Sequence, residues 1–334
     1  MTKSEKHTAE TQSALNCWYV TGATASGKSD VGVELAERLN GEIISLDSMA
    51  IYRGMDIGTA KPTHAQRQRI VHHLIDIADP NETFSVSRYR ELALQTIDEI
   101  RQRGRTPIFV GGTALYLKAL LRGIFEGPPA DWDFRREVTA EVQRIGLEPL
   151  YKRLQQVDPL AAHKLHPQDE RRIIRALEVY KQTGIPISHW QQEFDVGASA
   201  ERCRVFSIRF PRPILHERIA SRVQEMFRRG LVAEVQQLLD RWTAFSHTAM
   251  QAVGYREVIE LLRDERDLAS TMEQVLIRTR RFARHQETWF RGLSECRMIE
   301  IATIDSPQSI ADRLIELSRD VPFEREKNQP RPVA

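Results

Sequence analysis

One stretch of the sequence has the residue types and the spacing needed to hold a polyphosphate. It fits G-x-x-x-x-G-K-[ST], a loop whose glycines let the backbone amides turn inward around phosphate oxygens. Lys28 adds a positive charge, and the Ser29 hydroxyl can bind Mg²⁺. We therefore predict a phosphate-binding P-loop made of Gly22, Ala23, Thr24, Ala25, Ser26, Gly27, Lys28 and Ser29.

The segments on either side of this loop fit a strand and a helix in the correct order. Residues 17–20 form a short apolar and aromatic run that is typical of a buried strand. The start of a helix carries a partial positive charge that adds to the attraction for phosphate. A glycine-bearing turn with a chance Lys-Ser pair is the alternative, and the matching strand and helix disfavour it. The apolar residues that recur at helical spacing after the loop are Val31, Leu35, Ala36 and Leu39.

Two further strand ends carry residues that could act on a bound ligand. Residues 42–46 read as a strand that ends at Asp47, and residues 107–110 read as a strand that runs into Gly111-Gly112-Thr113. In an open α/β sheet the carboxyl ends of the strands face the ligand, so both side chains should lie near the phosphates. Asp47 could be a Mg²⁺ ligand, a general base or the N-cap of the next turn. The Thr113 hydroxyl should face the ligand, and it could also cap the following helix.

One feature of nucleotide hydrolases is missing from the sequence. None of its apolar strands ends in the aspartate that such enzymes place beside a water-activating acid, and the strand over residues 107–110 ends in glycine. Polyphosphate binding without hydrolysis of a nucleoside triphosphate is therefore an open alternative.

The pattern of elements predicts an α/β fold, with a P-loop NTPase-like parallel sheet flanked by helices and an all-helical insertion domain. Residues 131–200 have charged helical patterns and no convincing strand, whereas an apolar strand returns at residues 204–208. The predicted parts are an α/β core over 16–125 and 201–318, a helical insertion over 126–200, and flexible tails over 1–15 and 319–334.

The arginine distribution is uneven. The net charge of +2 does not by itself indicate a nucleic-acid partner. Six arginines nevertheless lie in one segment with only two acids, Glu287 and Glu295. Contact with a phosphate backbone and a solvated helix face explain this excess equally well. The six are Arg278, Arg280, Arg281, Arg284, Arg291 and Arg297.

The composition excludes some classes of protein. At 334 residues, 41% hydrophobic and 28% charged, the chain resembles a soluble globular protein. It has no run approaching the roughly eighteen apolar residues of a membrane span, and its N-terminus lacks the apolar core of a signal peptide. Three widely spaced cysteines favour reduced thiols over a disulfide frame. We expect a cytoplasmic protein with no membrane contact.

Taken in order, several stretches resemble one family, the tRNA dimethylallyltransferases (isopentenyltransferases). The P-loop alone is shared with kinases and many NTPases, but the ordered set is far more specific. The stretches are 22–29, Asp47-Ser48, 51–62, 111–116, 172–179, 253–257 and 286–291.

The resemblance implies transfer of a dimethylallyl group from its diphosphate to the N6 amine of an adenosine beside the tRNA anticodon, with release of pyrophosphate. Residues 22–29 would hold the leaving group with Mg²⁺ on Ser29, and Arg218 or Arg222 would clamp the diphosphate. Asp47 would accept the amine proton, and Thr113 would orient the base or the allyl diphosphate. The expected partners are dimethylallyl diphosphate and the anticodon stem-loop of a tRNA, bound by a monomer.

The resemblance also implies a set of tRNA contacts around an adenine that must be flipped out of its stack. Arg135 is equally well explained as a surface arginine. The implied contacts are Asp47, Ser48, Met49, Ala50, Thr113, Arg135, Arg171, Arg172, Ile173, Ile174, Arg175, Gln251, Ala252, Val253, Gly254, Tyr255, Arg256, Arg284, His285, Gln286, Glu287, Thr288, Trp289, Phe290 and Arg291.

The sequence departs from the family pattern at three positions. Ala23 stands where many members have proline, and Ala50 stands where a longer side chain is common. Ala50 puts a side-chain contact to the base from that position in doubt. His285 replaces a commonly basic residue, so a phosphate contact there would be weaker or pH-dependent.

Two other functions share part of this pattern. A small-molecule or nucleoside kinase would use the P-loop and the sheet, but it would need a nucleoside triphosphate as donor and would not need the arginine-rich segment. An RNA-binding NTPase module would use both features without any transfer chemistry. Preference for dimethylallyl diphosphate over a nucleoside triphosphate distinguishes the first of these from a transferase.

Overall fold

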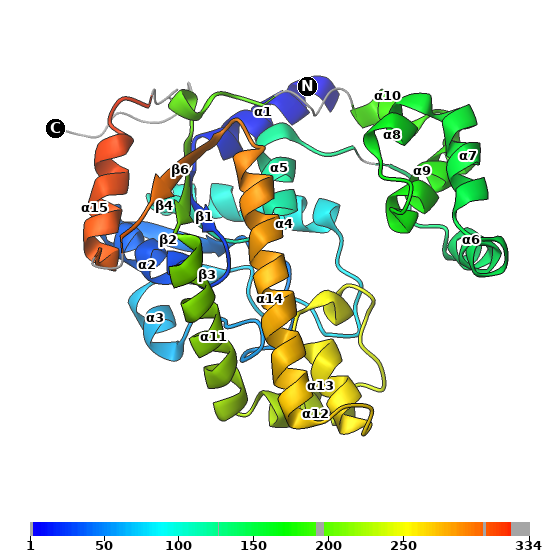
Figure 1. The fold of residues 1–334 in the computed structure, drawn as a ribbon. Coiled ribbons are helices and arrows are strands. Elements are labelled where there is room, and N and C mark those ends of the chain that lie inside the picture. The colour runs from blue at the N-terminus through cyan, green and yellow to red at the C-terminus, as the bar shows by residue number, and fades with distance from the viewer. Residues whose placement is uncertain (1–2, 126, 192–196, 303–304, 322–334) are drawn as a thin grey trace. The chain divides into compact units, whose positions relative to one another are not determined.

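The strand that leads into the P-loop lies in the middle of a six-stranded, fully parallel sheet (Figure 1). Its neighbours are the strand that precedes Thr113 on one side and the strand that begins at Arg204 on the other. The predicted α/β fold with a parallel sheet is confirmed. In spatial order the strands are β3 (His72–His73), β2 (Gly41–Ser45), β4 (Thr106–Gly111), β1 (Trp18–Gly22), β5 (Arg204–Arg209) and β6 (Cys296–Glu300).

The computed structural model describes residues 3–125, 127–191, 197–302 and 305–321. The chain forms two compact units. The larger contains residues 1–121 and 197–334, and the smaller contains residues 122–196. The predicted tail over 319–334 lies outside the described residues from position 322 onward.

Helices cover both faces of the sheet because successive strand residues point to opposite sides. Tyr19 and Phe109 stack on one face with their ring centroids 4.8 Å apart, whereas Val20 and Ile108 belong to the other face. The first face is covered by α1 (Lys3–Leu15), α4 (Val86–Gln102), α5 (Ala114–Arg122), α12 (Leu231–Arg241) and α13 (Tyr255–Leu262). The second is covered by α2 (Lys28–Arg38), α11 (Arg212–Arg228) and α15 (Pro307–Leu317), while α14 (Leu268–Arg291) contributes to both cores. Among the described residues of this unit, the short elements include α3 (His64–Arg69) and the 3₁₀ turns Ala200–Arg202 and Ala249–Gln251.

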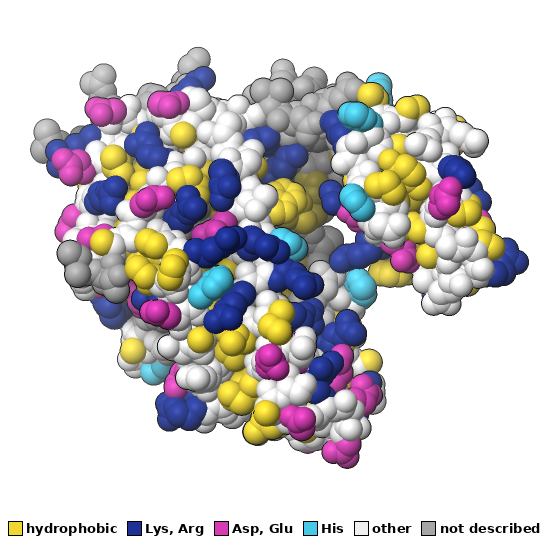
Figure 2. Space-filling view, viewed as in Figure 1, with side chains coloured by type: hydrophobic (Ala, Val, Ile, Leu, Met, Phe, Trp, Pro, Cys, Tyr) yellow, Lys and Arg dark blue, Asp and Glu magenta, His cyan; other side chains and the backbone are white. Residues whose placement is uncertain are grey.

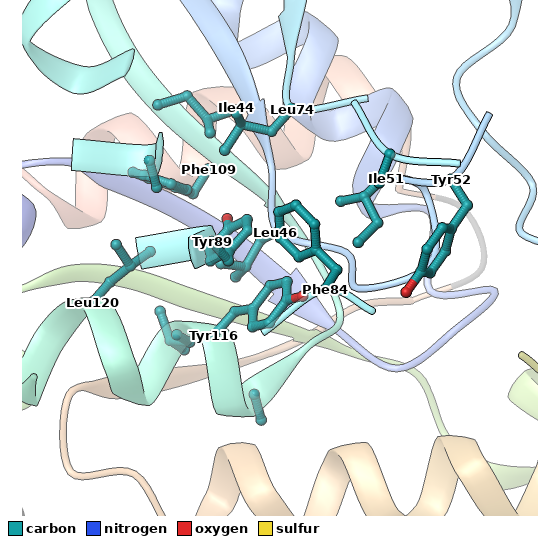
Figure 3. Packing of buried hydrophobic residues seen from close by; sticks show 14 of the residues in the cluster. Ile44, Leu46, Ile51, Tyr52, Leu74, Phe84, Tyr89, Phe109, Tyr116 and Leu120 are labelled. Atoms are coloured by element: carbon teal, nitrogen blue, oxygen red, sulfur yellow. The ribbon is translucent and has the colours of Figure 1, made fainter. Parts of the chain in front are cut away.

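The core on the first face holds the end of β2 in place (Figure 3). Tyr89 and Tyr116 are stacked with centroids 3.8 Å apart, and both are buried. The Tyr89 hydroxyl donates a hydrogen bond of 2.8 Å to the carbonyl of Ser45, the last residue of β2. Aromatic packing in this core therefore fixes the backbone two residues before Asp47.

The predicted flexible tail over 1–15 was wrong, because Lys3–Leu15 form α1. Ala14 is buried in the first core, and Glu10 forms an ion pair of 2.8 Å with the buried Arg90. The guanidinium of Arg101 also donates to the Ser13 carbonyl at 2.9 Å. These contacts come from α4, far along the chain, so a local reading of the polar N-terminal segment does not show them. The sequence reading also missed β6, α13 and α15.

The smaller unit is helical throughout its regular structure, with its own apolar core. The fully buried carboxylate of Glu178 lies inside it. This carboxylate accepts two hydrogen bonds of 2.8 Å from Arg135, one of 2.5 Å from Arg175 and one of 2.8 Å from the amide of Asp131. The helices are α6 (Trp132–Ile145), α7 (Glu148–Val157), α8 (Pro159–Lys164), α9 (Glu170–Thr183) and α10 (Ile187–Gln191), of which α8 and α10 were not predicted.

Among the described residues, no helix is both long enough and apolar enough to cross a bilayer.

We predict that Glu178→Gln destabilises the smaller unit by about 2 kcal/mol, because it leaves two half-buried arginines without a carboxylate. Burial alone would raise the pKa of Glu178, but the hydrogen bonds from Arg135 and Arg175 outweigh it and lower the pKa. Hydrogen exchange of the α9 amides measures the change locally. Glu148→Gln, which removes the exposed ion pair with Lys152, is the matched control and should leave exchange unchanged.

Candidate active site

The P-loop has a backbone that favours glycine at two positions. Gly22 has φ of +142°, and a Cβ there would lie 2.5 Å from the carbonyl oxygen of Ile208 in β5. Gly27 has φ of +80° and immediately precedes α2. The loop therefore turns from the end of β1 into the N-terminus of α2, which directs the first amides of the helix towards an anion.

Two cationic side chains meet in front of this loop. Burial and the neighbouring positive charge of Arg222 lower the pKa of Lys28 to about 8, although Asp47 opposes the shift. Burial also lowers the pKa of Arg222, again against the effect of Asp47. Two positive charges that are held together away from water favour an anion in the space between them.

The charged residues line a cavity of about 340 Å³ at the carboxyl ends of the strands. Lys28, Ser29, Asp47, Thr113 and Arg222 all border it, so the structure brings together side chains from the P-loop, two strand ends and α11. An adjoining groove of about 570 Å³ shares Lys28, Ser29 and Arg222 with the cavity.

Arg218 and Arg222 have different surroundings. Arg218 lines only the outer groove, and its Nε donates to the carbonyl of Ala25 in the P-loop at 2.8 Å. Arg222 lines both hollows, and its buried Nε has no hydrogen-bond partner among the described residues. Arg218 therefore supports the loop, while Arg222 offers an unused donor to a ligand.

Asp47 and Thr113 are fixed by short-range hydrogen bonds. Oδ1 of Asp47 accepts the amides of Met49 at 2.8 Å and Ala50 at 3.3 Å, so Asp47 does cap the following turn. The Thr113 hydroxyl accepts the amide of Ser48 at 3.0 Å. These bonds join the end of β2 to the loop after β4 at the floor of the cavity. Capping and a chemical role for Asp47 are compatible, because the carboxylate also borders the cavity.

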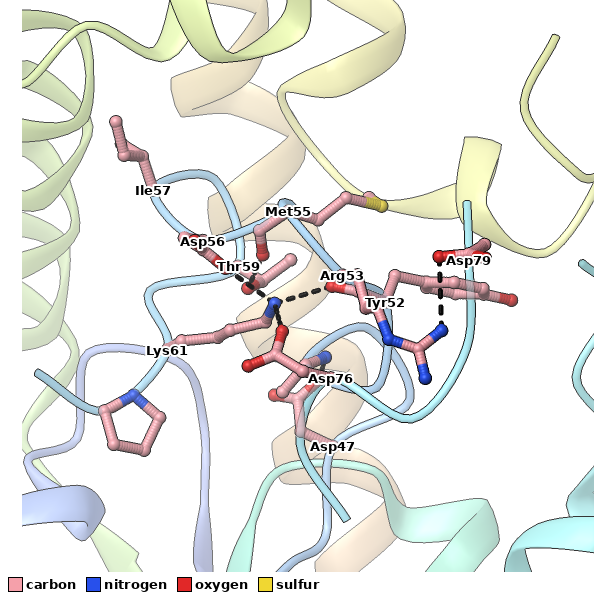
Figure 4. Close-up of polar contacts among 12 residues, drawn as sticks. Asp47, Tyr52, Arg53, Met55, Asp56, Ile57, Thr59, Lys61, Asp76 and Asp79 are labelled. Carbon is pink, nitrogen blue, oxygen red and sulfur yellow. Dashed lines mark hydrogen bonds and ion pairs between the residues drawn. The ribbon is translucent and has the colours of Figure 1, made fainter. Parts of the chain in front are cut away.

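A loop that closes one side of the cavity is anchored by buried charges (Figure 4). The Lys61 ammonium donates to the carbonyl of Tyr52 at 2.6 Å, to Asp56 at 2.6 Å and to Asp76 at 2.5 Å. From α12, the Glu234 carboxylate accepts the backbone amides of residues 56, 57 and 58. Residues 58–62 then line the cavity wall. Neither anchor was predicted. The stretch 51–62 contains Tyr52, Asp56 and Lys61, but the sequence does not show that they bond to one another, and Glu234 lies far along the chain.

Of the predicted tRNA contacts in the larger unit, some are accessible and others are not. Residues 48–50 and 251–253 line the cavity. On α14, exposed basic side chains cover the face seen in Figure 2, and Trp289 is 47% exposed. The exposed basic residues of this helix are Arg281, Arg284, His285 and Arg291, with Thr288 also exposed and Glu287 half-buried.

Several predicted contacts are buried in the cores instead. Tyr255 and Phe290 are fully buried, and the Tyr255 hydroxyl donates to Glu234 at 2.7 Å. Arg278 pairs with the buried Glu257, so it supports the fold as well. A sequence stretch gives a run of positions but not their orientation, and on a helix only one side of the run faces outward. Ala252 and Gln286 have little exposed surface, although both border the cavity, Gly254 is the N-cap of α13, and Arg256 is exposed and bonded to Glu260.

In the smaller unit, Arg171 and Arg172 are exposed at the start of α9, whereas Ile173 and Ile174 belong to its core. Arg135 and Arg175 are half-buried partners of Glu178. Their first role is therefore structural, and a contact with RNA would have to use the exposed part of each guanidinium.

Several cavity residues were not predicted from the sequence, among them Met226, Thr279 and Phe282. Phe282 of α14 borders the cavity although 44% of its surface is exposed. An aromatic side chain at the mouth of a cavity can stack on a base. The signal available in the sequence was an aromatic residue between arginines, and it is also compatible with an ordinary helix.

The family model described as IPP transferase matches residues 50–293, which is 244 of 334 positions. The chain belongs to the IPP transferase family. The resemblance identified from the sequence is thereby confirmed.

Relatives of this IPP transferase cover almost its whole length. It is 49% identical over 305 residues to a tRNA dimethylallyltransferase of Rhodopirellula baltica, covering 89% of this chain and 91% of the relative. It is similar to a full-length tRNA isopentenylpyrophosphate transferase structure from Bacillus halodurans, with a TM-score of 0.64 and 38% identity over 91% and 98% of the two chains. It also resembles a eukaryotic dimethylallyltransferase acting on tRNA, with a TM-score of 0.74 and 26% identity over 93% and 81%.

We predict that this IPP transferase binds pyrophosphate more weakly as the pH rises through about 8, the pKa of Lys28. Below this pH the ammonium is charged and attracts the anion, and above it the attraction is lost. Calorimetric titrations between pH 7 and 9 measure the effect. The Lys28→Arg variant keeps its positive charge between pH 7 and 9. Any pH dependence that remains in this variant therefore comes from ionisation of pyrophosphate itself. An equal pH dependence in both proteins would contradict the assignment to Lys28.

Proposed function

We propose that the chain transfers a dimethylallyl group from dimethylallyl diphosphate to the N6 amine of the adenosine next to the anticodon of a tRNA, releasing pyrophosphate. The observation that carries this proposal is the cavity in which Lys28 and Arg222 border the same space as Asp47 and Thr113. An anion site and a proton acceptor thus border one space that can hold the allyl group.

In the reaction, the bond between C1 of the allyl group and the diphosphate oxygen breaks as N6 bonds to C1. Negative charge grows on the leaving oxygen, and groups that bind this charge lower the barrier. Lys28 and the P-loop amides would bind the diphosphate from one side. Arg222 would bind it from α11, because it borders both the cavity and the adjoining groove.

The amine loses a proton as its bond to carbon forms, and Asp47 would accept it. Both backbone amides that bond to Asp47 use Oδ1, so the carboxylate is held in one orientation by the turn that it caps. Thr113 would orient the base, because its hydroxyl lies at the same floor of the cavity, bonded to Ser48. The N6 amine, C1 and the leaving oxygen would then lie in line.

Ser29 fits a Mg²⁺ ion that is bound mainly by phosphate oxygens and water. Its side chain is exposed and borders both hollows beside Lys28. Mg²⁺ typically takes only one or two protein ligands when it binds phosphates. When bound, the ion would neutralise part of the charge on the leaving group.

For the RNA, we propose that the exposed basic side of α14 contacts the phosphate backbone while the adenine enters the cavity. Extrusion is needed because N6 cannot reach C1 inside a base stack. The proposed machinery comes from one chain, so a cytoplasmic monomer would suffice.

Incubation with bulk unmodified tRNA, Mg²⁺ and labelled dimethylallyl diphosphate, followed by nucleoside analysis, tests the proposal. Label in a dimethylallyl-adenosine product is expected. Turnover of ATP without labelled nucleoside would favour a kinase instead.

We predict that Asp47→Asn lowers turnover at least about a hundredfold, because the amide keeps the turn but cannot accept the proton. Binding of the tRNA and of pyrophosphate should change less than about twofold. Single-turnover rates and filter binding measure the two effects. Asp240→Asn, at an exposed position of α12 that borders neither hollow, is the control. A loss of tRNA affinity that matches the loss of turnover would make Asp47 a recognition residue.

We predict that replacing Arg284 and Arg291 by Ala weakens tRNA binding and reduces its salt dependence by roughly one unit of log–log slope for each lost phosphate contact. Binding isotherms at several salt concentrations give the slope. Arg228→Ala removes an exposed arginine of α11 that is paired with Glu225 and serves as the control. An unchanged slope in the double variant would remove α14 from the RNA interface.

A further inference from the structure

Gln286 is a buried polar residue of α14 that bonds to two separate loops of the site. Its side-chain carbonyl accepts the amide of Thr24 in the P-loop at 2.8 Å. Its side-chain NH₂ donates to the carbonyl of Gly112, after β4, also at 2.8 Å. Only 7% of its surface is exposed.

The two bonds need both halves of an amide. One partner is a donor and the other an acceptor, so the orientation of the Gln286 side chain is fixed. A carboxylate would keep the bond with Thr24 but could not donate to Gly112. A side chain of the same length without polar atoms would make neither bond and would leave two backbone groups unsatisfied.

The loop after β4 is shaped around this side chain. A Cβ at Gly112 would lie 2.3 Å from Nε2 of Gln286, closer than any real contact. The residue that follows, Thr113, holds the amide of Ser48, and Ser48 follows Asp47. A continuous series of hydrogen bonds therefore joins the P-loop to the turn that carries the proposed proton acceptor.

We propose that Gln286 is a positioning residue that sets the distance between the phosphate-binding loop and the strand ends bearing Thr113 and Asp47. The family resemblance placed Gln286 among the tRNA contacts, and Gln286 also borders the cavity, but both ends of its amide bond to the protein. This inference rests on the proposed function, because the distance matters for turnover only if the loop and Asp47 act in the same reaction. The consequence is that its loss disturbs diphosphate binding and turnover while leaving RNA affinity almost unchanged.

The test compares Gln286→Met with wild type in three assays: binding of inorganic pyrophosphate without RNA, binding of the anticodon stem-loop, and the single-turnover rate. We expect pyrophosphate affinity to fall about tenfold and the rate to fall at least as much. RNA affinity should stay within about twofold. Gln236→Met, an exposed glutamine of α12, is the matched control and should change none of the three.

The opposite pattern, with RNA affinity lost and pyrophosphate affinity kept, would overturn the proposal and restore Gln286 as an RNA contact. The wild-type protein tests the proposed function separately. If it binds pyrophosphate but transfers no prenyl group, the proposed function is refuted, but the role of Gln286 in the loop is not. Gln286→Glu covers the case in which the methionine variant fails to fold, and it should show the same pattern.

A second variant tests the contact itself. Gly112→Ala should weaken pyrophosphate binding, because the added methyl group displaces the Gln286 amide. In a Gln286→Ala background the shorter side chain leaves room, so the same methyl group should have a much smaller effect. An equal effect of Gly112→Ala in both backgrounds would contradict the proposal.

Discussion

The main constraint on this site is that the positive charges of Lys28 and Arg222 must be held close together before a ligand neutralises them. Burial and the charge of Arg222 lower the pKa of Lys28, burial lowers the pKa of Arg222, and Asp47 opposes both shifts only in part. Like charges that are removed from water repel each other strongly. A flexible loop would allow these two charges to move apart. The backbone around the site must therefore be rigid. The parallel sheet provides it, because the P-loop and the turn after β2 begin at strand ends that share the same edge.

The supports around the cavity share one principle, which is that a buried or half-buried side chain bonds to backbone atoms of a loop or strand end. Tyr89 holds the end of β2, and Glu234 holds three successive amides of the loop that lines the cavity. Lys61 and Gln286 bond to backbone carbonyls in the same way. Backbone groups cannot change rotamer, so such bonds fix the position of a loop better than contacts between two flexible side chains.

The sequence predicted those parts of the fold and of the site whose residues lie close together along the chain. The P-loop, the sheet and the strand ends at Asp47 and Thr113 follow from local patterns, and the family is confirmed. The supports could not be predicted in this way. Gln286 and Thr24 are 262 positions apart, and no local pattern relates Glu234 to the loop over residues 56–58. Helix α1 was missed for the same reason, since its contacts come from α4. The orientation of Tyr255 and Phe290 also required the packed core, because a motif does not show which side of a helix is buried.

The central claim is that the P-loop holds a leaving pyrophosphate while Asp47 reaches the amine of an extruded adenine. A crystal structure with an unreactive thio analogue of dimethylallyl diphosphate and an anticodon stem-loop measures both distances at once. The account predicts the diphosphate against Lys28 and Arg222, with a carboxylate oxygen of Asp47 about 2.6–3.2 Å from N6, directly or through one water. A diphosphate bound outside residues 22–29, or an adenine amine beyond the reach of Asp47, would contradict it.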